Sequence, residues 1–221
     1  MNLETLRKLV SLGEGSKVEF KRKAADPVKI MREVVAFANA SGGVLLIGVN
    51  DDGVITGLKD ADGEAFVLKN AIEKHCKPAI NYTLEYIKLN EKKNVLAFHI
   101  EESNEKPVFL IYNFNRHLGR AYLRVADRSI QSSRELRKIL KARTKEREAF
   151  FVYGEYERKL IQFATLEGKI KLKDFAVYAN IQEEQASEIL VQLTLANVLE
   201  IHPEEQGDLY SVKEFNNSLK R

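Results

Sequence analysis

Basic residues are concentrated between positions 116 and 147, where their chemistry suits phosphate. This stretch holds 11 lysines and arginines against 3 aspartates and glutamates. Most of the basic residues are arginines, whose planar guanidinium matches two phosphate oxygens better than the compact ammonium of lysine. Such a stretch is typical of a protein that contacts a nucleic-acid backbone. For residues 132–147, a solvated helix face is the competing interpretation.

Aromatic side chains accompany the first arginines of this stretch. Tyr112 and Phe114 come just before Arg116, and Tyr122 lies between Arg120 and Arg124, on a segment that has the pattern of a hairpin. Aromatic rings beside basic side chains can stack on bases and sugars. The residues predicted to contact nucleic acid are Arg116, Arg120, Arg124, Arg128, Arg137, Lys141 and Lys21.

Carboxylates form a second group near the start of the chain. Glu14 and Glu19 come before a six-residue apolar run at 44–49, and Asp51 and Asp52 come directly after it. The run has the length of a strand buried on both faces, and the Asn-Asp-Asp-Gly sequence that follows is typical of a turn. Around Glu19 the residues alternate, so Val18 and Phe20 are expected to face inward and Glu19 outward. These acidic side chains could therefore lie close together along one rim of the domain.

The first 147 residues carry the patterns of several strands and few helices, which predicts an α+β domain with a mixed sheet. The expected helices are 1–12, 27–40, 62–74 and 132–145. The expected strands are 18–22, 44–49, 54–58, 81–89, 93–100, 108–112 and 119–125, with 44–49 and 54–58 forming a hairpin. Asn39 and Ser41 are expected to end the second helix, and Gly42-Gly43 to supply the turn after it.

Residues 153–215 have the pattern of a second, smaller domain. Three helices at 156–166, 172–178 and 182–196 precede two short strands at 198–202 and 209–212, which is the element order of a winged helix. The third helix carries Glu183, Glu184 and Glu188 and no basic residue. Because phosphates flank the grooves of DNA, we expect this helix to mediate dimerisation or partner binding rather than to read bases.

Composition limits the other classes of function. The net charge is +3, with 27 basic against 20 acidic residues in 1–152 and 8 against 12 in 153–221. The one cysteine, Cys76, excludes a disulfide framework and a cysteine-based zinc site. The sequence shows no signal-peptide core and no apolar run of membrane-spanning length, so a soluble, cytoplasmic protein without membrane contact is expected.

Several short motifs follow one another in a fixed order between about residues 10 and 135. They are Glu14 with Glu19-Phe20-Lys21, Ala36-Phe37-Ala38-Asn39 with Ser41-Gly42-Gly43, Ile47-Gly48-Val49-Asn50-Asp51-Asp52-Gly53, Lys106-Pro107-Val108, and Ala121-Tyr122-Leu123-Arg124-Val125. In this order they resemble the Schlafen-type, Alba-like DNA-binding domain, a family also labelled divergent AAA-type ATP-binding. The chain has Arg124-Val125-Ala126-Asp127 where Arg-Val-Gly-Ser is expected, which puts in doubt the close backbone approach to a ligand that a glycine permits.

The resemblance also implies a nuclease site. In the Schlafen group whose members cut tRNA and rRNA, three carboxylates bind metal, and by spacing these would be Glu14, Glu19 and Asp51 here. Oxygen ligands suit Mg²⁺ or Mn²⁺, and Lys21 would stabilise the charge of the transition state. The competing interpretation is structural: Glu14 caps a turn, Glu19 pairs with a lysine, and Asp51 belongs to an ordinary hairpin turn.

We therefore predict a nucleic-acid-binding protein, with a DNA-binding transcriptional regulator as the role that the resemblance implies. The alternative is a metal-dependent endoribonuclease acting on structured RNA, and a third interpretation is an assembly module whose basic face binds an acidic protein. Binding would need no cofactor, whereas cleavage would need Mg²⁺ or Mn²⁺. The sequence of residues 13–17 is not a phosphate-binding loop, so ATP is not expected. A homodimer or a protein partner would use the second domain.

Overall fold

The computed structural model describes residues 1–116, 118–145 and 153–213. The chain divides into two compact units, Met1–Gln131 and Ser132–Arg221. Unit 1 is the larger, and each unit has its own apolar core. Among the residues that the structure describes, no helix is both long enough and apolar enough to cross a lipid bilayer.

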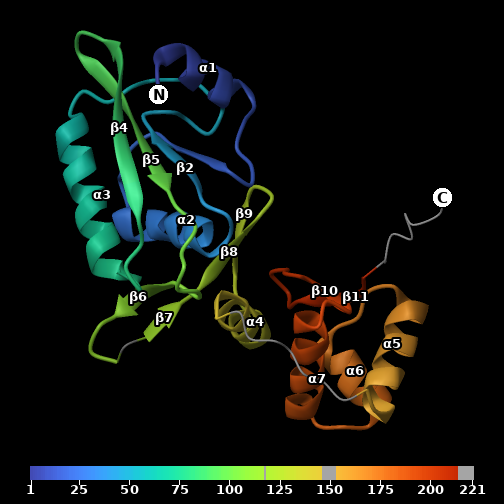
Figure 1. Ribbon diagram of the computed structural model, residues 1–221. Coiled ribbons are helices and arrows are strands. Elements are labelled where there is room, and N and C mark those ends of the chain that lie inside the picture. Colours follow the sequence, from blue (N-terminus) through green and yellow to red (C-terminus); the bar gives the residue numbers. More distant parts are fainter. Residues whose placement is uncertain (117, 146–152, 214–221) are drawn as a thin grey trace. The chain divides into compact units, whose positions relative to one another are not determined.

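A four-stranded mixed sheet forms the centre of unit 1 (Figure 1). Its strand order is β1-β2-β5-β4, with bounds Val18–Lys21, Gly43–Ile47, Lys93–Ile100 and Tyr82–Asn90. Strands β1 and β2 are parallel, and the other neighbours are antiparallel. The predicted α+β class with a mixed sheet is confirmed.

Helices cover both faces of this sheet. Helices α2 (Pro27–Asn39) and α3 (Ala61–His75) share one core with alternate residues of β2 and β5, such as Leu45 and Phe98. Helix α1 (Leu3–Ser11) shares a second core with the residues between them, such as Leu46 and Ala97. Strand β2 is therefore buried on both faces, as its continuous apolar run predicts.

The end of α2 fixes the entry into β2. The side chain of Asn39 donates hydrogen bonds to the carbonyls of Val108 and Tyr122 (2.9 Å each), and it accepts one from the Val108 N–H (2.7 Å). Gly42 then has φ +75°, and a Cβ there would lie 2.6 Å from the carbonyl oxygen of Ile100. Only glycine fits at this turn, for both reasons.

The predicted hairpin of 44–49 with 54–58 is wrong. Residues 54–58 form no strand; they make isolated bridges of Ile55 to Val49 and of Leu58 to Asn94, and the N–H groups of Thr56 and Gly57 donate to the Gly48 carbonyl. The partners of β2 are β1 and β5 instead. Both sides of β2 therefore pair with strands that are distant in the sequence, and the local pattern of residues does not indicate such pairing.

Two smaller sheets complete unit 1. Strands β3 (Cys76–Lys77), β6 (Phe109–Asn113) and β7 (Leu118–Arg120) form one, and β8 (Tyr122–Val125) and β9 (Arg128–Gln131) form the other. The segment predicted as one strand, 119–125, is divided at Ala121 between the two sheets. Ala126 has φ +53° in the turn from β8 to β9, so it takes the left-handed conformation that glycine would accept at less cost.

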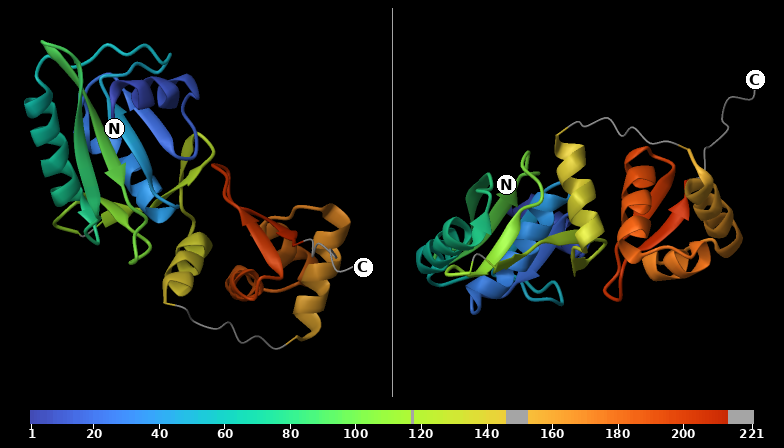
Figure 2. Two further views of the ribbon diagram at one scale, coloured as in Figure 1. Left: turned by 45° about the horizontal axis from the view of Figure 1, so that its top comes forward. Right: turned by 90° about the horizontal axis from the view of Figure 1, so that it is seen from below.

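Unit 2 contains four helices and a two-stranded antiparallel hairpin within its described residues. The helices are α4 (Arg134–Thr144), α5 (Glu155–Glu167), α6 (Leu172–Ala179) and α7 (Glu183–Leu195), and the strands are β10 (Leu199–His202) and β11 (Leu209–Val212). The hairpin lies against α5 and α7 (Figure 2) around the buried side chains of Leu160, Phe175, Leu190 and Tyr210. This is the predicted element order, and its identity as a winged helix stays a prediction.

Helix α4 belongs to unit 2, whereas the sequence pattern predicts it at the end of a first domain of residues 1–147. It packs against α7, and Ser187 on α7 donates a hydrogen bond to Glu135 on α4 (2.6 Å). With the boundary at 131, unit 1 has 20 basic and 17 acidic residues, and unit 2 has 15 of each. The basic residues of α4 therefore offset the acidic residues of α7 and its neighbours. The predicted ends at 147 and 215 lie outside the described residues.

Candidate nucleic-acid interface

The predicted acidic residues lie before and within β1 and just after the carboxyl end of β2. Glu14 lies in the turn before the strand, and its carboxylate accepts a hydrogen bond from the Phe20 N–H (2.7 Å). Burial raises the pKa of Glu14, and the nearby charges of Glu19 and Asp51 also raise it, while the Phe20 hydrogen bond and Lys21 lower it. Glu14 is thus close enough to Glu19, Lys21 and Asp51 for their charges to act on it.

Glu19 is buried, although the alternation along its strand predicts an outward side chain. It does point away from Val18 and Phe20, but α2 covers that face of the sheet. One carboxylate oxygen accepts from Arg124 (2.7 Å) and the other pairs with Lys21. Both oxygens therefore already have cationic partners.

Arg124 is the buried centre of this arrangement, and its predicted contact with phosphate is at odds with that position. Its guanidinium pairs with Glu19 and with Glu33 of α2 (3.0 Å), and it also donates to the carbonyl oxygens of Gly15 and Val18. It lies over the ring of Phe37, 5.0 Å from the centroid. Arg124 ties β8, α2 and the start of β1 together, so we leave it out of the interface.

The third predicted carboxylate lies in a different setting. Asp51 and Asp52 are exposed after β2, and they line a hollow of about 530 Å³ with Arg7 and residues of the loop after α1. Glu14 and Glu19 do not line this hollow. Within residues 1–116, 118–145 and 153–213, no group of three or more acidic, histidine or cysteine side chains is arranged to hold a metal ion.

The hairpin of β6 and β7 carries an exposed group of aromatic and basic side chains. Tyr112, Phe114, Arg116 and Arg120 are all exposed. The guanidinium of Arg120 lies 5.3 Å from the centre of the Tyr112 ring. Hydrogen bonding to Tyr122 and Tyr112 raises the pKa of Arg120 further. The hairpin therefore offers an aromatic face and a permanent positive charge side by side.

The end of α3 adds two residues that the sequence analysis did not select. The ammonium of Lys74 lies 5.5 Å from the centre of the Phe114 ring, and the rings of His75 and Phe114 are 5.2 Å apart. His75 is held by a hydrogen bond between its Nδ1 and the carbonyl of Ile111 (2.7 Å). We call Tyr112, Phe114, Arg116, Arg120, Lys74 and His75 the hairpin face. Only the pairing of β3 with β6 brings α3 here, and no local sequence signal indicates it.

The remaining predicted cations are distributed over other elements. Arg128 is exposed at the start of β9. Lys21 is engaged by Glu19 and by the Phe20 carbonyl (2.8 Å). Arg137 donates to the Ser132 carbonyl (2.9 Å), and Lys141 is exposed, but both belong to α4 and therefore to unit 2. Residues 117, 146 and 147 of the predicted basic stretch lie outside the described residues.

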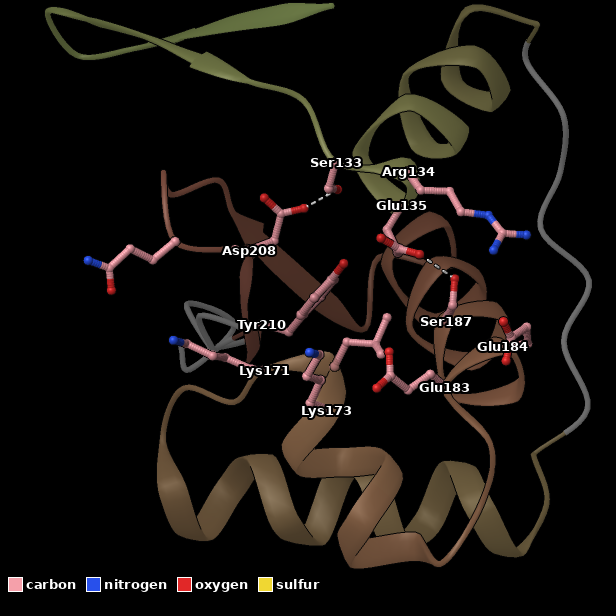
Figure 3. Close-up of a pocket in the computed structure, with 13 residues that line it drawn as sticks. Ser133, Arg134, Glu135, Lys171, Lys173, Glu183, Glu184, Ser187, Asp208 and Tyr210 are labelled. Atoms are coloured by element: carbon pink, nitrogen blue, oxygen red, sulfur yellow. Dashed lines mark hydrogen bonds between the residues drawn. The ribbon is translucent and has the colours of Figure 1, made fainter.

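Unit 2 contains a cavity of about 380 Å³ that is lined by α4, α6, α7 and the β10–β11 turn (Figure 3). Ser133 donates to Asp208 inside it, and Glu135 and Ser187 are bonded at its wall. Burial raises the pKa of Asp208, and burial together with Asp208 and Glu135 raises that of Tyr210. Three basic and four acidic side chains line the cavity, so it has no excess of positive charge to favour phosphate.

Residues 14–133 match the model of the family described as Schlafen, AlbA_2. That range contains all of β1 to β9, the acidic residues and the hairpin face, and it ends just before α4. The search of curated proteins finds no match.

The solved structures that match this chain include two with TM-scores below 0.5. One is the solution structure of the N-terminal domain of a RecG-related protein from Nitrosomonas europaea, with 26% identity and a TM-score of 0.40, covering 48% of this chain and 78% of that one. The other is the DIP2311 protein from Corynebacterium diphtheriae, with 19% identity and a TM-score of 0.43. That match covers 88% of this chain but only 34% of the other protein.

Proposed function

Because the chain belongs to the Schlafen, AlbA_2 family, we propose that it binds nucleic acid through the hairpin face of unit 1. The family is consistent with a nucleic-acid-binding role. The observation that carries the proposal is the set of cation–aromatic pairs, Arg120 with Tyr112 and Lys74 with Phe114, on an exposed surface. Rings of this kind stack on bases while the neighbouring cations neutralise phosphates.

The regulatory part of the proposal concerns unit 2. We propose that the protein acts as a transcriptional regulator in which unit 1 makes the nucleic-acid contact. Helix α7 is acidic and has α4 packed against it, which supports a role in assembly or partner binding for this unit rather than base reading. The homodimer and the cytoplasmic location stay predictions.

The proposal is tested by measuring binding of a labelled oligonucleotide at increasing salt concentration. Each phosphate that a cation neutralises releases counterions, so the logarithm of the binding constant should fall linearly with the logarithm of salt. We expect measurable affinity at about 50 mM salt and a loss of at least tenfold by about 200 mM. Binding that ignores salt, or none at low salt, would exclude this function.

A second candidate is the metal-dependent endoribonuclease. Its support is that Glu14 lies close enough to Glu19, Lys21 and Asp51 for their charges to shift its pKa. For a metal to bind, Glu19 would have to exchange Arg124 or Lys21 for the ion. Cleavage of a structured RNA that requires Mn²⁺ and is lost in Asp51→Asn would establish this activity. Equal cleavage with excess chelator would rule it out.

A further inference from the structure

A cavity of about 370 Å³ in unit 1 is bordered by four cations from three separate segments. Arg22 and Lys23 follow β1, Lys59 lies in the segment before α3, and Lys93 begins β5. The volume is within the range of small-molecule sites. None of the cavity's lining residues belongs to the hairpin face or to the acidic group around Glu19.

The position of this cavity follows from the sheet. Strands β1 and β2 run parallel, and Arg22 and Lys23 come directly after the carboxyl end of β1. Strand β5 runs antiparallel to β2, so Lys93 at the start of β5 lies at the end of the sheet where β1 and β2 have their carboxyl ends. The crevice beyond the carboxyl ends of parallel strands is where ligands commonly bind in α/β sheets.

The two carboxylates at the cavity have other partners. Asp60 caps α3 by accepting from the Gly63 N–H (2.9 Å), and Glu64 accepts from the Ala24 N–H (2.6 Å). In the part of the chain that the structure describes, none of the four cations forms an ion pair. Lys93 donates to the Thr56 carbonyl (2.7 Å), which orders the loop at the cavity wall.

We propose that this cavity is an anion site that takes a phosphate group. Four cations against two engaged carboxylates leave a net charge of about +2 at the opening, which favours a doubly charged oxyanion. Arginine supplies two parallel donors for phosphate oxygens, and the lysines add mobile charges around them. The phosphate can belong to a nucleic-acid backbone or to a free phosphorylated compound. The site does not depend on the hairpin face.

Pyrophosphate is the probe that tests this site, titrated calorimetrically into the full chain at low ionic strength. The triple variant Arg22→Gln, Lys23→Gln, Lys59→Gln is expected to lose at least tenfold in pyrophosphate affinity. Lys93 is kept because it holds the loop. The matched control is Lys29→Gln, Lys69→Gln, Lys145→Gln, which removes three exposed cations that do not line the cavity. Its affinity for pyrophosphate should stay within about twofold of wild type, since screening weakens distant charges.

Oligonucleotide binding by the same variants identifies the source of the phosphate. A larger loss of oligonucleotide affinity in the cavity variant than in the control assigns the site to a nucleic-acid backbone. Unchanged oligonucleotide affinity, with pyrophosphate binding lost, assigns it to a free phosphorylated compound. No pyrophosphate binding by wild type, or equal binding by the cavity variant, overturns the proposal. Neither result depends on whether the hairpin face binds nucleic acid.

Discussion

Replacing Arg124 with methionine is expected to lower the free energy of unfolding of unit 1 by about 3–5 kcal/mol. The guanidinium is buried and pairs with two carboxylates, those of Glu19 and Glu33. Methionine retains much of the apolar volume, but Glu33 loses its ion pair with Arg124, and Glu19 keeps Lys21 alone. Removing one partner of a buried ion pair costs far more than the pair itself contributes. Urea denaturation followed by circular dichroism measures the change.

Arg128→Met is the matched control for this prediction. Arg128 belongs to the same β8–β9 hairpin but is exposed, so its replacement should change stability by no more than about 0.5 kcal/mol. Equal stability of the two variants would show that Arg124 does not hold the unit together. It would also restore Arg124 as a residue available for phosphate.

Replacing Tyr112 with alanine is expected to weaken binding of a single-stranded oligonucleotide about tenfold, and Phe114→Ala should have a similar effect. Both rings are exposed and each has a cation beside it. Stacking of a base on such a ring contributes about 1–3 kcal/mol, and 1.4 kcal/mol corresponds to a factor of ten. Fluorescence anisotropy with a labelled oligonucleotide measures both variants under one salt condition.

Tyr86→Ala is the appropriate control for these two variants. Tyr86 is 46% exposed and Tyr112 48%, but Tyr86 lies on β4 of the central sheet, away from the hairpin face. Its replacement should leave affinity within about twofold of wild type. If Tyr86→Ala weakens binding as much as Tyr112→Ala, the rings act through general surface hydrophobicity rather than through a defined face.

The elements of this protein are largely predictable from its sequence because each carries its own local signal. Asp26 and Pro27 mark the start of α2, where the Asp26 side chain accepts from the Lys29 N–H (3.0 Å). The buried run at β2 and the alternation in β4 and β5 are equally local. Strand β9 was missed, since its four residues pair with β8 and lack an apolar pattern of their own.

Local sequence signals do not show which residues contact the predicted site residues. Glu19 and Arg124 are 105 positions apart, and Lys74 is 40 positions from Phe114. Alternation correctly separates Glu19 from Phe20, but it does not reveal that helices cover both faces of the sheet. The charge of Glu19, which alternation predicts to be exposed, is therefore buried and paired. The opposite holds for Arg22, Lys23, Lys59 and Lys93, whose separate segments meet at one cavity.

The split of charge between the two domains also depends on the tertiary structure, and counting along the sequence does not give it correctly. The predicted split of basic and acidic domains depends on where α4 is placed, and α4 packs within unit 2. Unit 2 then has no net charge, and unit 1 keeps only +3. The case for nucleic-acid binding therefore depends on where the exposed cations of unit 1 lie rather than on total charge.

The most direct test of the proposed function is the salt dependence of oligonucleotide binding by wild type and by Arg116→Gln, Arg120→Gln. Each phosphate contact on a single strand contributes about 0.7 to the slope of log affinity against log salt. We therefore predict a slope shallower by about 1.4 in the double variant, while Lys29→Gln, Lys69→Gln keeps the wild-type slope. Equal slopes for wild type and the Arg116, Arg120 variant would contradict binding through the hairpin face.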